Sequence, residues 1–543
     1  MKNINRRTFT RQALAAAALL GLGRSARLFA QDQRLAKPGA TVKTTTGSVR
    51  GLVREDVQQF WNLPYGASTA GANRFMPPQP VQPWSGVRDH FSIGTRCWQQ
   101  PGVGEPAPVV LAMNRLEEES EDCLRLNVFT PTADNGARPV MVWLHGGGFT
   151  SGSGNYLIYD GTLLAKKEDV VVVSVTHRLN IFGFLHLADL GGAEWAGATN
   201  AGMQDIVAAL QWVRDNIAAF GGDPQRVTIF GQSGGGSKVT TLMAMPSASG
   251  LYHRAIAQSG AALRGVPASD ASAATERFLA KLGIGTNQLR RLHGLTPQEI
   301  QQALYSEPVI QNFAGGPVID GAVIPRHQWD PSAPEFSADV PLMAGSTATE
   351  NGWLGPPPYD MEDGDMQAQF TRLANGDAAK GGELLALYHR IYPNVRNRVL
   401  WLIAESDNTR RRNAQVLNVL KHAQATAPSW LYYFDWHSPV DGNRMGAYHT
   451  LDIPFVFNNV DVAASMTGAA QERYQLAHVM SAAWAAFARS GNPDHADMPH
   501  WPAFDPGTYP TMVFASETGL RNDPNREERE ALEALGTVVR GGA

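Results

Sequence analysis

The stretch RVTIFGQSGG, residues 226–235, decides how this 543-residue chain folds. The apolar run at 226–230 predicts a buried strand, and the residues after Ser233 predict a helix that extends to about residue 245. The glycines on either side of the serine allow neighbouring backbone to come close. A strand-to-helix turn this tight holds its central hydroxyl clear of the carboxyl edge of a sheet.

Strands and helices alternate on both sides of this stretch. Apolar runs at 126–130, 139–145 and 170–176 predict strands, and the last run is nearly all valine, which indicates burial on both faces. The periodicity of 203–219 predicts an amphipathic helix. Further strands are expected at 41–46, 49–55, 254–258, 340–344, 430–436 and 511–515, and further helices at 408–424 and 471–490. This order predicts an α/β fold with a mostly parallel sheet that helices cover on both faces.

The composition excludes several classes of protein. Hydrophobic residues make up 43% of the chain and charged residues 18%, which excludes a disordered chain. The net charge of -4 argues against a nucleic-acid partner. No apolar run reaches the roughly 20 residues that a membrane-spanning helix needs. Two cysteines cannot form a four-thiolate zinc site.

The amino terminus is predicted to be a targeting segment. Residues 1–30 contain no acid, and their basic residues are Lys2, Arg6, Arg7, Arg11, Arg24 and Arg27. The twin arginine followed by the apolar stretch 13–22 resembles a bacterial twin-arginine export signal. We therefore expect export to the periplasm, cleavage after Ala30, and one catalytic domain over 31–543. The alternative is a disordered basic tail.

Export changes the interpretation of the two cysteines. Cys97 and Cys123 are the only cysteines of the chain. In an oxidising compartment the pair could close a loop and stabilise the fold by about 3–4 kcal/mol. The alternative is two buried thiols. Given export, we expect the disulfide.

A second glycine-rich segment lies upstream of Ser233. The predicted strand at 139–144 ends in the sequence HGGGF, residues 145–149. Consecutive glycines leave their backbone N–H groups unshielded, and with the N–H of Gly234 they could form an oxyanion hole. Each such donor lowers a barrier by about 3–4 kcal/mol. The alternative is a flexible glycine turn.

A nucleophilic serine needs a base, and the base needs an orienting acid. In folds with this turn, the chain order is serine, then acid, then histidine. The acids near downstream strand ends are Asp320, Asp339 and Glu350, and the histidines in downstream loops are His437 and His449. The residues alone do not choose among them.

Motifs spread along the chain point to one known family. They are NLPYG at 62–66, RFMPP at 74–78, EDCLRLNV at 121–128, FGGDPQRVTIFGQSGG at 220–235, GLYHRAI at 250–256, QSG at 258–260, PVIDG at 317–321, GSTATE at 345–350 and GAYHTLDIPFVF at 446–457. In this order, over about residues 41 to 515, they resemble the type-B carboxylesterases, the family of para-nitrobenzyl esterases, animal carboxylesterases and cholinesterases.

The resemblance implies a fold, a reaction and a set of site residues. The fold is the α/β-hydrolase fold with large loop and helical insertions. The site residues are Ser233 as nucleophile, Glu350 as acid, His449 as base, Gly147, Gly148 and Gly234 as oxyanion donors, and Cys97 with Cys123 as a disulfide. The implied reaction is two-step hydrolysis of a small-molecule ester, with no metal and no cofactor. Activity should rise through a pKa near 7, because His449 must be neutral to act as base.

The chain departs from the family pattern in places. Gln232 stands where glutamate is usual, which removes a negative charge beside Ser233 and should disfavour cationic esters such as choline esters. Gly234 replaces the usual alanine and keeps the N–H, Arg125 replaces an aromatic residue, and Asn351 replaces a glycine. Two alternatives stay open: a non-catalytic binding or adhesion protein on the same scaffold, and a hydrolase of amides, thioesters or lactones.

Overall fold

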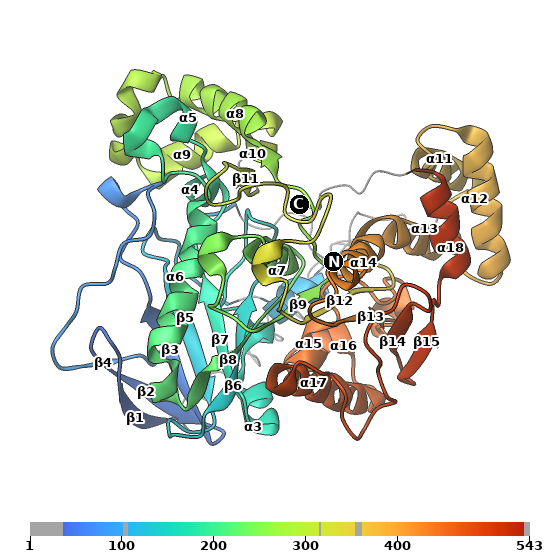
Figure 1. Ribbon diagram of the computed structural model, residues 1–543, viewed down its shortest axis with the longest axis horizontal. Coiled ribbons are helices and arrows are strands. Elements are labelled where there is room, and N and C mark those ends of the chain that lie inside the picture. The colour runs from blue at the N-terminus through green and yellow to red at the C-terminus, as the bar shows by residue number, and fades with distance from the viewer. Residues whose placement is uncertain (1–35, 101–106, 114, 314–315, 353–360, 537–543) are drawn as a thin grey trace, which may run out of the picture.

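The computed structural model describes residues 36–100, 107–113, 115–313, 316–352 and 361–536 (Figure 1). The predicted export signal at 1–30 lies outside these residues, so export stays a prediction. Within the described ranges, no helix combines the length and the apolar character needed to cross a membrane.

A 13-stranded sheet forms the centre of the molecule, with the order β1-β2-β3-β5-β7-β6-β8-β9-β12-β13-β14-β15 and with β4 beside β2. Its parallel part comprises β7 (Val171–Thr176), β6 (Arg138–Leu144), β8 (Gly222–Gln232), β9 (Arg254–Gln258), β12 (Leu342–Thr347), β13 (Ser429–Phe434) and β14 (Pro510–Phe514). Antiparallel pairing adds β1 (Lys37–Lys43), β2 (Ser48–Arg54), β3 (Val57–Pro64) and β5 (Arg125–Thr130) on one side and β15 (Gly519–Asn522) on the other. The short β4 (Val87–Asp89) runs parallel to β2. The predicted mostly parallel sheet is confirmed.

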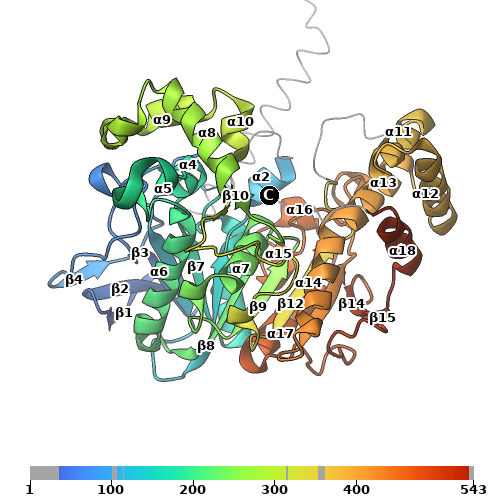
Figure 2. The ribbon, with the colours of Figure 1, turned by 45° about the horizontal axis from the view of Figure 1, so that its top comes forward.

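Helices cover both faces of this sheet because alternate side chains of each strand point to opposite faces (Figures 1 and 2). Val140, Val142 and Leu144 of β6 share a core with α6 (Ala201–Asn216), α7 (Gly234–Met243) and α14 (Arg412–Ala423). Met141 and Trp143 share the opposite core with α3 (Thr162–Glu168), α17 (Glu472–Ser490) and α15 (Ile453–Val456). The valines of β7 divide between the two cores, as a strand buried on both faces requires.

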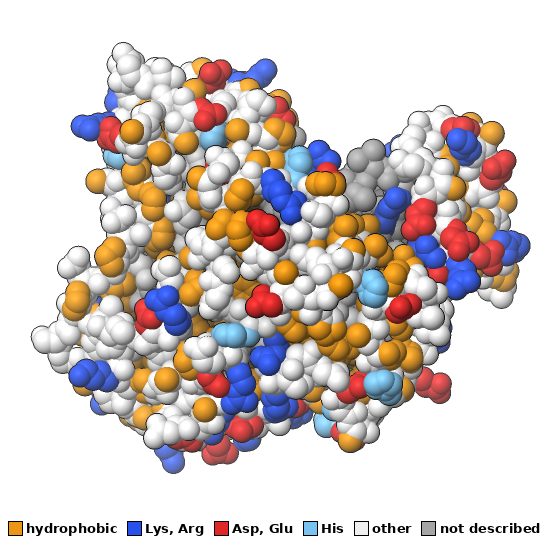
Figure 3. Space-filling view, viewed as in Figure 1, with side chains coloured by type: hydrophobic (Ala, Val, Ile, Leu, Met, Phe, Trp, Pro, Cys, Tyr) orange, Lys and Arg blue, Asp and Glu red, His pale blue; other side chains and the backbone are white. Residues whose placement is uncertain are grey.

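Two groups of helices extend beyond the sheet. The first contains α4 (Asn180–Phe184), α5 (Ala188–Gly191), α8 (Ala268–Lys281), α9 (Pro297–Leu304) and α10 (Pro308–Phe313), next to the small sheet of β10 (Val266–Pro267) and β11 (Val318–Ile319). The second contains α11 (Asp363–Leu373), α12 (Ala378–Ile391), α13 (Asn397–Ser406) and α18 (Arg526–Ala534), which have a core of their own. Figure 3 shows a hollow between the two groups and acidic and basic side chains interspersed over this face. The short helices α2 (Ala107–Met113) and α16 (Ala464–Thr467) pack against each other.

The predicted disulfide between Cys97 and Cys123 is wrong for this structure. Both residues are buried free thiols. The Cys97 sulfur accepts the N–H of Leu179 at 3.3 Å. A hydrogen bond between the two thiols, together with burial, raises the pKa of Cys123 well above its ordinary value. The raised pKa keeps Cys123 protonated and poorly reactive, in agreement with the alternative of two small buried side chains.

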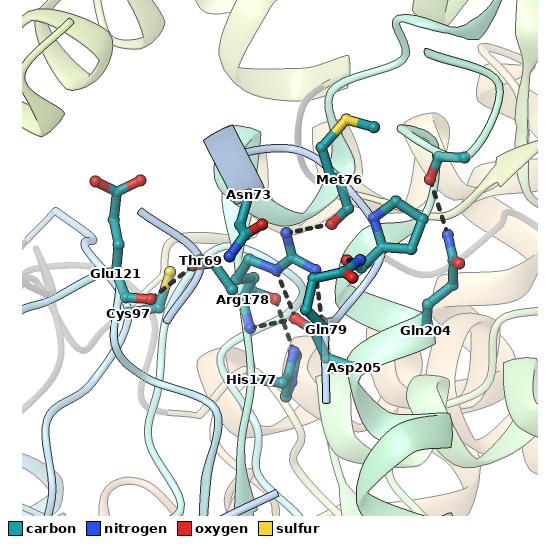
Figure 4. Close-up of polar contacts among 12 residues, drawn as sticks. Thr69, Asn73, Met76, Gln79, Cys97, Glu121, His177, Arg178, Gln204 and Asp205 are labelled. Atoms are coloured by element: carbon teal, nitrogen blue, oxygen red, sulfur yellow. Dashed lines mark hydrogen bonds and ion pairs between the residues drawn. The ribbon is translucent and has the colours of Figure 1, made fainter. Parts of the chain in front are cut away.

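A buried ion pair joins the loop after β7 to α6. Arg178 and Asp205 are almost completely inaccessible, and Nη2 of Arg178 lies 2.6 Å from Oδ1 of Asp205. Figure 4 shows the guanidinium between this carboxylate and the backbone carbonyl of Met76, to which Nη1 donates at 2.7 Å. A charge pair in this environment is stable only when both partners are present.

Removing one partner of this pair should therefore destabilise the protein strongly. We expect Arg178→Met to lower the free energy of unfolding by about 3–5 kcal/mol, because Asp205 would be left buried and unpaired. The double variant Arg178→Met with Asp205→Leu should recover most of this loss. Urea unfolding followed by circular dichroism measures both. A loss below about 1 kcal/mol in the single variant would contradict the interpretation.

Candidate active site

Ser233 lies at the turn between β8 and α7, as the sequence predicts. Its backbone has φ of 59° and ψ of -126°, a strained conformation for a residue with a side chain. Its N–H donates to the carbonyl of Gln258 in β9 at 2.8 Å, which anchors the turn to the neighbouring strand. Ser233 is partly exposed, whereas Gln232 and Gly234 are buried. The turn therefore exposes the serine while the residues on either side of it stay packed in the interior.

Two glycines make this turn possible by letting backbones touch. A Cβ atom on Gly235 would collide with the carbonyl oxygen of Leu144, the last residue of β6. A Cβ atom on Gly260 would collide with the carbonyl oxygen of Ser233 itself. Because backbone atoms cannot move aside as a side chain can, these positions admit only glycine. The turn is thus locked between the ends of β6 and β9.

The predicted oxyanion donors lie at the same place. Gly147 and Gly148 follow β6 with φ of 88° and 61°, a region that favours glycine. A Cβ atom on Gly234 would collide with the backbone nitrogen of Gly148, so these two backbones are in contact. Gly234 is also the first residue of α7, where an N–H has no acceptor within the helix. The structure therefore brings the glycine loop and the serine turn together.

Of the acids and histidines left open by the sequence, the structure brings Glu350 and His449 together. Nδ1 of His449 lies 2.5 Å from Oε2 of Glu350, and the N–H of His449 donates to the Glu350 carbonyl at 3.1 Å. Both side chains are buried. His437 instead lies 3.1 Å from Asp435 at the surface, and Asp320 accepts from Asn200 at 3.0 Å. Asp339 instead interacts electrostatically with Tyr252 and with Lys421 of α14.

Glu350 is held rigidly after the end of β12. Its Oε1 accepts the N–H of Thr347 at 2.9 Å, and its own N–H donates to the hydroxyl of Ser406 at 2.8 Å. Nε of Arg410 lies 3.8 Å from its Oε2. Burial opposes ionisation, but His449 and Arg410 outweigh it, so the pKa of Glu350 stays below its ordinary value. The carboxylate is therefore ionised at neutral pH.

His449 is set to be a neutral imidazole. Burial lowers the pKa of His449 to about 4, the positive charge of Arg410 adds to this effect, and Glu350 opposes it. The pH at which this imidazole loses its proton thus lies below the value near 7 expected from the sequence. Arg410 lies just before α14, in the π-helical turn Asp407–Arg411, and it carries no motif signal of its own.

Gln232 contacts the same imidazole. Its Nε2 lies 3.2 Å from Nδ1 and 3.4 Å from Nε2 of His449. Because Gln232 is the chain neighbour of Ser233, this contact places His449 against the serine turn. The sequence shows that residue 232 lacks the negative charge usual in the family, but it does not indicate the contact with the histidine.

A further buried acid lies behind the site. Asp452 accepts from Nε2 of Gln258 at 2.8 Å and from the hydroxyl of Tyr432 at 3.3 Å. Burial is the main cause that raises the pKa of Asp452 to about 7. The motif at 446–457 contains this residue, so its position is readable from the sequence although its surroundings are not. Among the residues that the structure describes, no group of three or more His, Cys, Asp or Glu side chains could hold a metal ion.

Comparison with known proteins agrees with this geometry. The profile of the carboxylesterase family matches residues 38–531. The para-nitrobenzyl esterase of Bacillus subtilis (strain 168) is 36% identical over 499 residues, which cover 90% of this chain and 98% of the relative. The cocaine esterase of Homo sapiens is 33% identical over 513 residues, which cover 88% of this chain and 87% of that protein.

Solved structures of relatives have the same fold. A carboxylesterase of Geobacillus stearothermophilus superposes with a TM-score of 0.78 at 36% identity, covering 91% of this chain and 99% of the other. An esterase of Clostridium hathewayi gives a TM-score of 0.79 at 31% identity, covering 91% and 98%. The fold is therefore that of an α/β-hydrolase, as the resemblance implied. The chain belongs to the carboxylesterase family, the type-B family whose motifs it carries, and is an ester-hydrolysing enzyme.

Proposed function

We propose that this enzyme is a serine carboxylesterase that works through a triad of Ser233, His449 and Glu350. The observation that carries the proposal is the buried pair of His449 and Glu350, 2.5 Å apart, packed against the residue next to Ser233. The order of the three residues along the chain is the one that this fold class uses. The partly exposed serine can reach a substrate, and the buried acid–base pair lies where it can activate the serine.

In the proposed mechanism the imidazole acts as base and then as acid in each of the two steps. Since a carboxylate only accepts, Nδ1 of His449 carries the hydrogen toward Glu350, which leaves Nε2 free to act as base. Nε2 takes the proton of Ser233 as the serine oxygen attacks the ester carbonyl, and Glu350 stabilises the imidazolium. The alcohol leaves with that proton. Nε2 then takes a proton from water as the water oxygen attacks the acyl carbon, and it returns this proton to the Ser233 oxygen as the acid leaves.

The negative charge that develops on the carbonyl oxygen needs donors. Gly147, Gly148 and Gly234 supply backbone N–H groups beside the serine turn in this proposal, and the contact between Gly148 and Gly234 supports it. Donors fixed by the backbone need no reorganisation at the moment of reaction. This arrangement requires no cofactor.

We further propose that the substrates are uncharged esters, with short-chain aryl esters as the first class to test. Gln232 leaves no carboxylate next to Ser233 that could attract a cationic alcohol group. The relative from Bacillus subtilis is named a para-nitrobenzyl esterase, which is compatible with an aryl leaving group. The twin-arginine pattern of residues 1–30 supports export to the periplasm as the place of action.

Replacing the nucleophile tests the proposal directly. We expect Ser233→Ala to lower kcat for para-nitrophenyl butyrate by about 10⁴-fold or more, since the covalent step is lost. Ser490→Ala, a change at the exposed end of α17, is the matched control and should keep parental kcat. A fluorophosphonate probe should label the parent at Ser233 and leave Ser233→Ala unlabelled. Parental turnover by Ser233→Ala would refute the triad.

Restoring a carboxylate beside the serine should change the charge preference. We expect Gln232→Glu to raise the ratio of kcat/KM for butyrylcholine to that for its uncharged carbon analogue by about 5- to 10-fold, because an anion close to the bound alcohol group attracts the cation. Initial rates with both esters, at one ionic strength, give the ratio. A ratio equal to that of the parent would show that residue 232 does not set this preference.

The pH profile should report the charge of Arg410. His449 must be neutral to act, so we expect the acid limb of kcat/KM to lie below pH 6.5, the ordinary pKa of histidine. Arg410→Gln removes a cation that disfavours the imidazolium, so the pKa of His449 should rise and the limb should move up by about 0.5–1 pH unit. Arg390→Gln, a surface change on α12, should leave it in place. A limb that stays or moves down in Arg410→Gln would contradict this role.

A further inference from the structure

A buried lysine lies directly behind the serine turn. Lys238 lies in the second turn of α7 and is completely buried. Its Nζ donates to the carbonyl oxygen of His145 at 2.8 Å and lies 5.6 Å from the centre of the Phe149 ring. Burial lowers the pKa of Lys238 to about 7, and no carboxylate among the described residues opposes this effect. A buried ammonium without an acid is unfavourable for folding, so its one hydrogen bond invites a functional explanation.

The hydrogen bond from Lys238 fixes the backbone of His145, the first residue of the glycine loop. The side chain of His145 in turn fixes the next residue of the loop. Nδ1 of His145 lies 2.8 Å from the carbonyl oxygen of Gly146. A carbonyl only accepts, so Nδ1 carries the hydrogen. Burial lowers the pKa of His145 well below its ordinary value, and the charge of Lys238 lowers it further, so the imidazole stays neutral in this tautomer.

The surroundings leave His145 little freedom. Its ring stacks on His177 with the ring centres 5.0 Å apart. His177 is fixed in turn, because its Nδ1 lies 2.7 Å from the carbonyl oxygen of Arg178. A Cβ atom on Gly152 would collide with Nδ1 of His145, so the loop backbone closes over the imidazole. Within the described residues, Nε2 of His145 has no hydrogen-bond partner.

These bonds control the direction of a backbone N–H. The carbonyl of Gly146 and the N–H of Gly147 belong to one planar trans peptide unit, in which they point in opposite directions. Fixing the carbonyl therefore fixes the N–H. Accepting a hydrogen bond at the carbonyl also polarises the peptide and makes its N–H a stronger donor.

We propose that Lys238 is a positioning residue of the oxyanion hole, which holds His145 so that His145 aims the N–H of Gly147 at the substrate oxygen. This inference rests on the proposed serine esterase mechanism. Because Lys238 lies in the same helix that begins after Ser233, α7 ties the nucleophile and Gly234 to the glycine loop as one unit. A change of Lys238 should thus affect the transition state more than substrate binding.

The chain offers a matched control for the effect of removing a buried lysine. Lys421 in α14 is also completely buried. Its Nζ donates to the carbonyls of Ser337 and Ala338 at 2.8 and 2.7 Å and to Gln424 at 3.0 Å, none of which belongs to the site. If buried lysines here serve only packing, Lys238→Met and Lys421→Met should behave alike.

The experiment compares Lys238→Met, Lys238→Gln and Lys421→Met with the parent. A fluorophosphonate count of active sites gives kcat per functional site, para-nitrophenyl butyrate gives kcat and KM, and an alkyl trifluoromethyl ketone gives Ki for an oxyanion adduct. We expect Lys238→Met to lose about 10- to 100-fold in kcat, somewhat less than deletion of a whole oxyanion donor, with KM within about threefold. Ki should rise in proportion to the loss in kcat. Lys238→Gln keeps an N–H donor and should recover part of the loss, whereas Lys421→Met should keep parental kcat and Ki.

Parental kcat and Ki in Lys238→Met would overturn the inference, whatever the stability of that variant. If Lys238→Met does not accumulate as folded protein, Lys238→Gln carries the test, and parental kcat with parental Ki in it would likewise overturn the inference. An equal loss in Lys421→Met would also overturn it. Failure of the proposed function is distinguishable from failure of this inference, because it would appear in proteins with Lys238 unchanged. The parent would not be labelled at Ser233, or Ser233→Ala would be active.

Discussion

The rest of the site depends on one steric constraint, the close approach of three backbones at the serine turn. Gly235 lies against the last carbonyl of β6, and Gly260, which follows β9, lies against the carbonyl of Ser233. Because neither contact leaves room for a methyl group, the turn cannot relax, and the positive φ of the serine is held by its neighbours. The contacts with the ends of the sheet strands thus maintain the strained conformation of this residue.

The parallel strands explain why chemistry collects at this point. The carboxyl ends of neighbouring parallel strands meet at one edge of a sheet, so residues far apart in the chain become neighbours. Ser233 follows β8, the glycine loop follows β6, Glu350 follows β12, and His449 lies in the loop after β13. Two cations contact these groups: the partly exposed Arg410 lies beside the acid, and the buried Lys238 lies beside the glycine loop.

The sequence alone predicts the parallel strands of the sheet and the turn that carries Ser233. Continuous apolar runs locate the parallel strands, and the glycines around Ser233 locate the turn, because both signals are local. Physical reasoning could not choose between His437 and His449, since the choice depends on how a long loop folds back; the family resemblance pointed to His449, and the structure shows it beside Glu350. The disulfide prediction depended on an oxidising compartment, which spacing does not reveal, and the structure holds both cysteines as buried free thiols. Arg410 and Lys238 carried no signal, as a charged residue inside a helix normally indicates a solvated face.

The acyl-enzyme on Ser233 is the central claim, and trapping it is the most direct measurement. The enzyme is mixed with para-nitrophenyl butyrate, quenched in acid within the burst phase, and analysed by mass spectrometry of the intact chain and of its peptides. The account predicts one butyryl group per chain, located on the peptide that contains Ser233 and absent after full turnover. A butyryl group on another residue, or rapid hydrolysis without any covalent adduct, would contradict it.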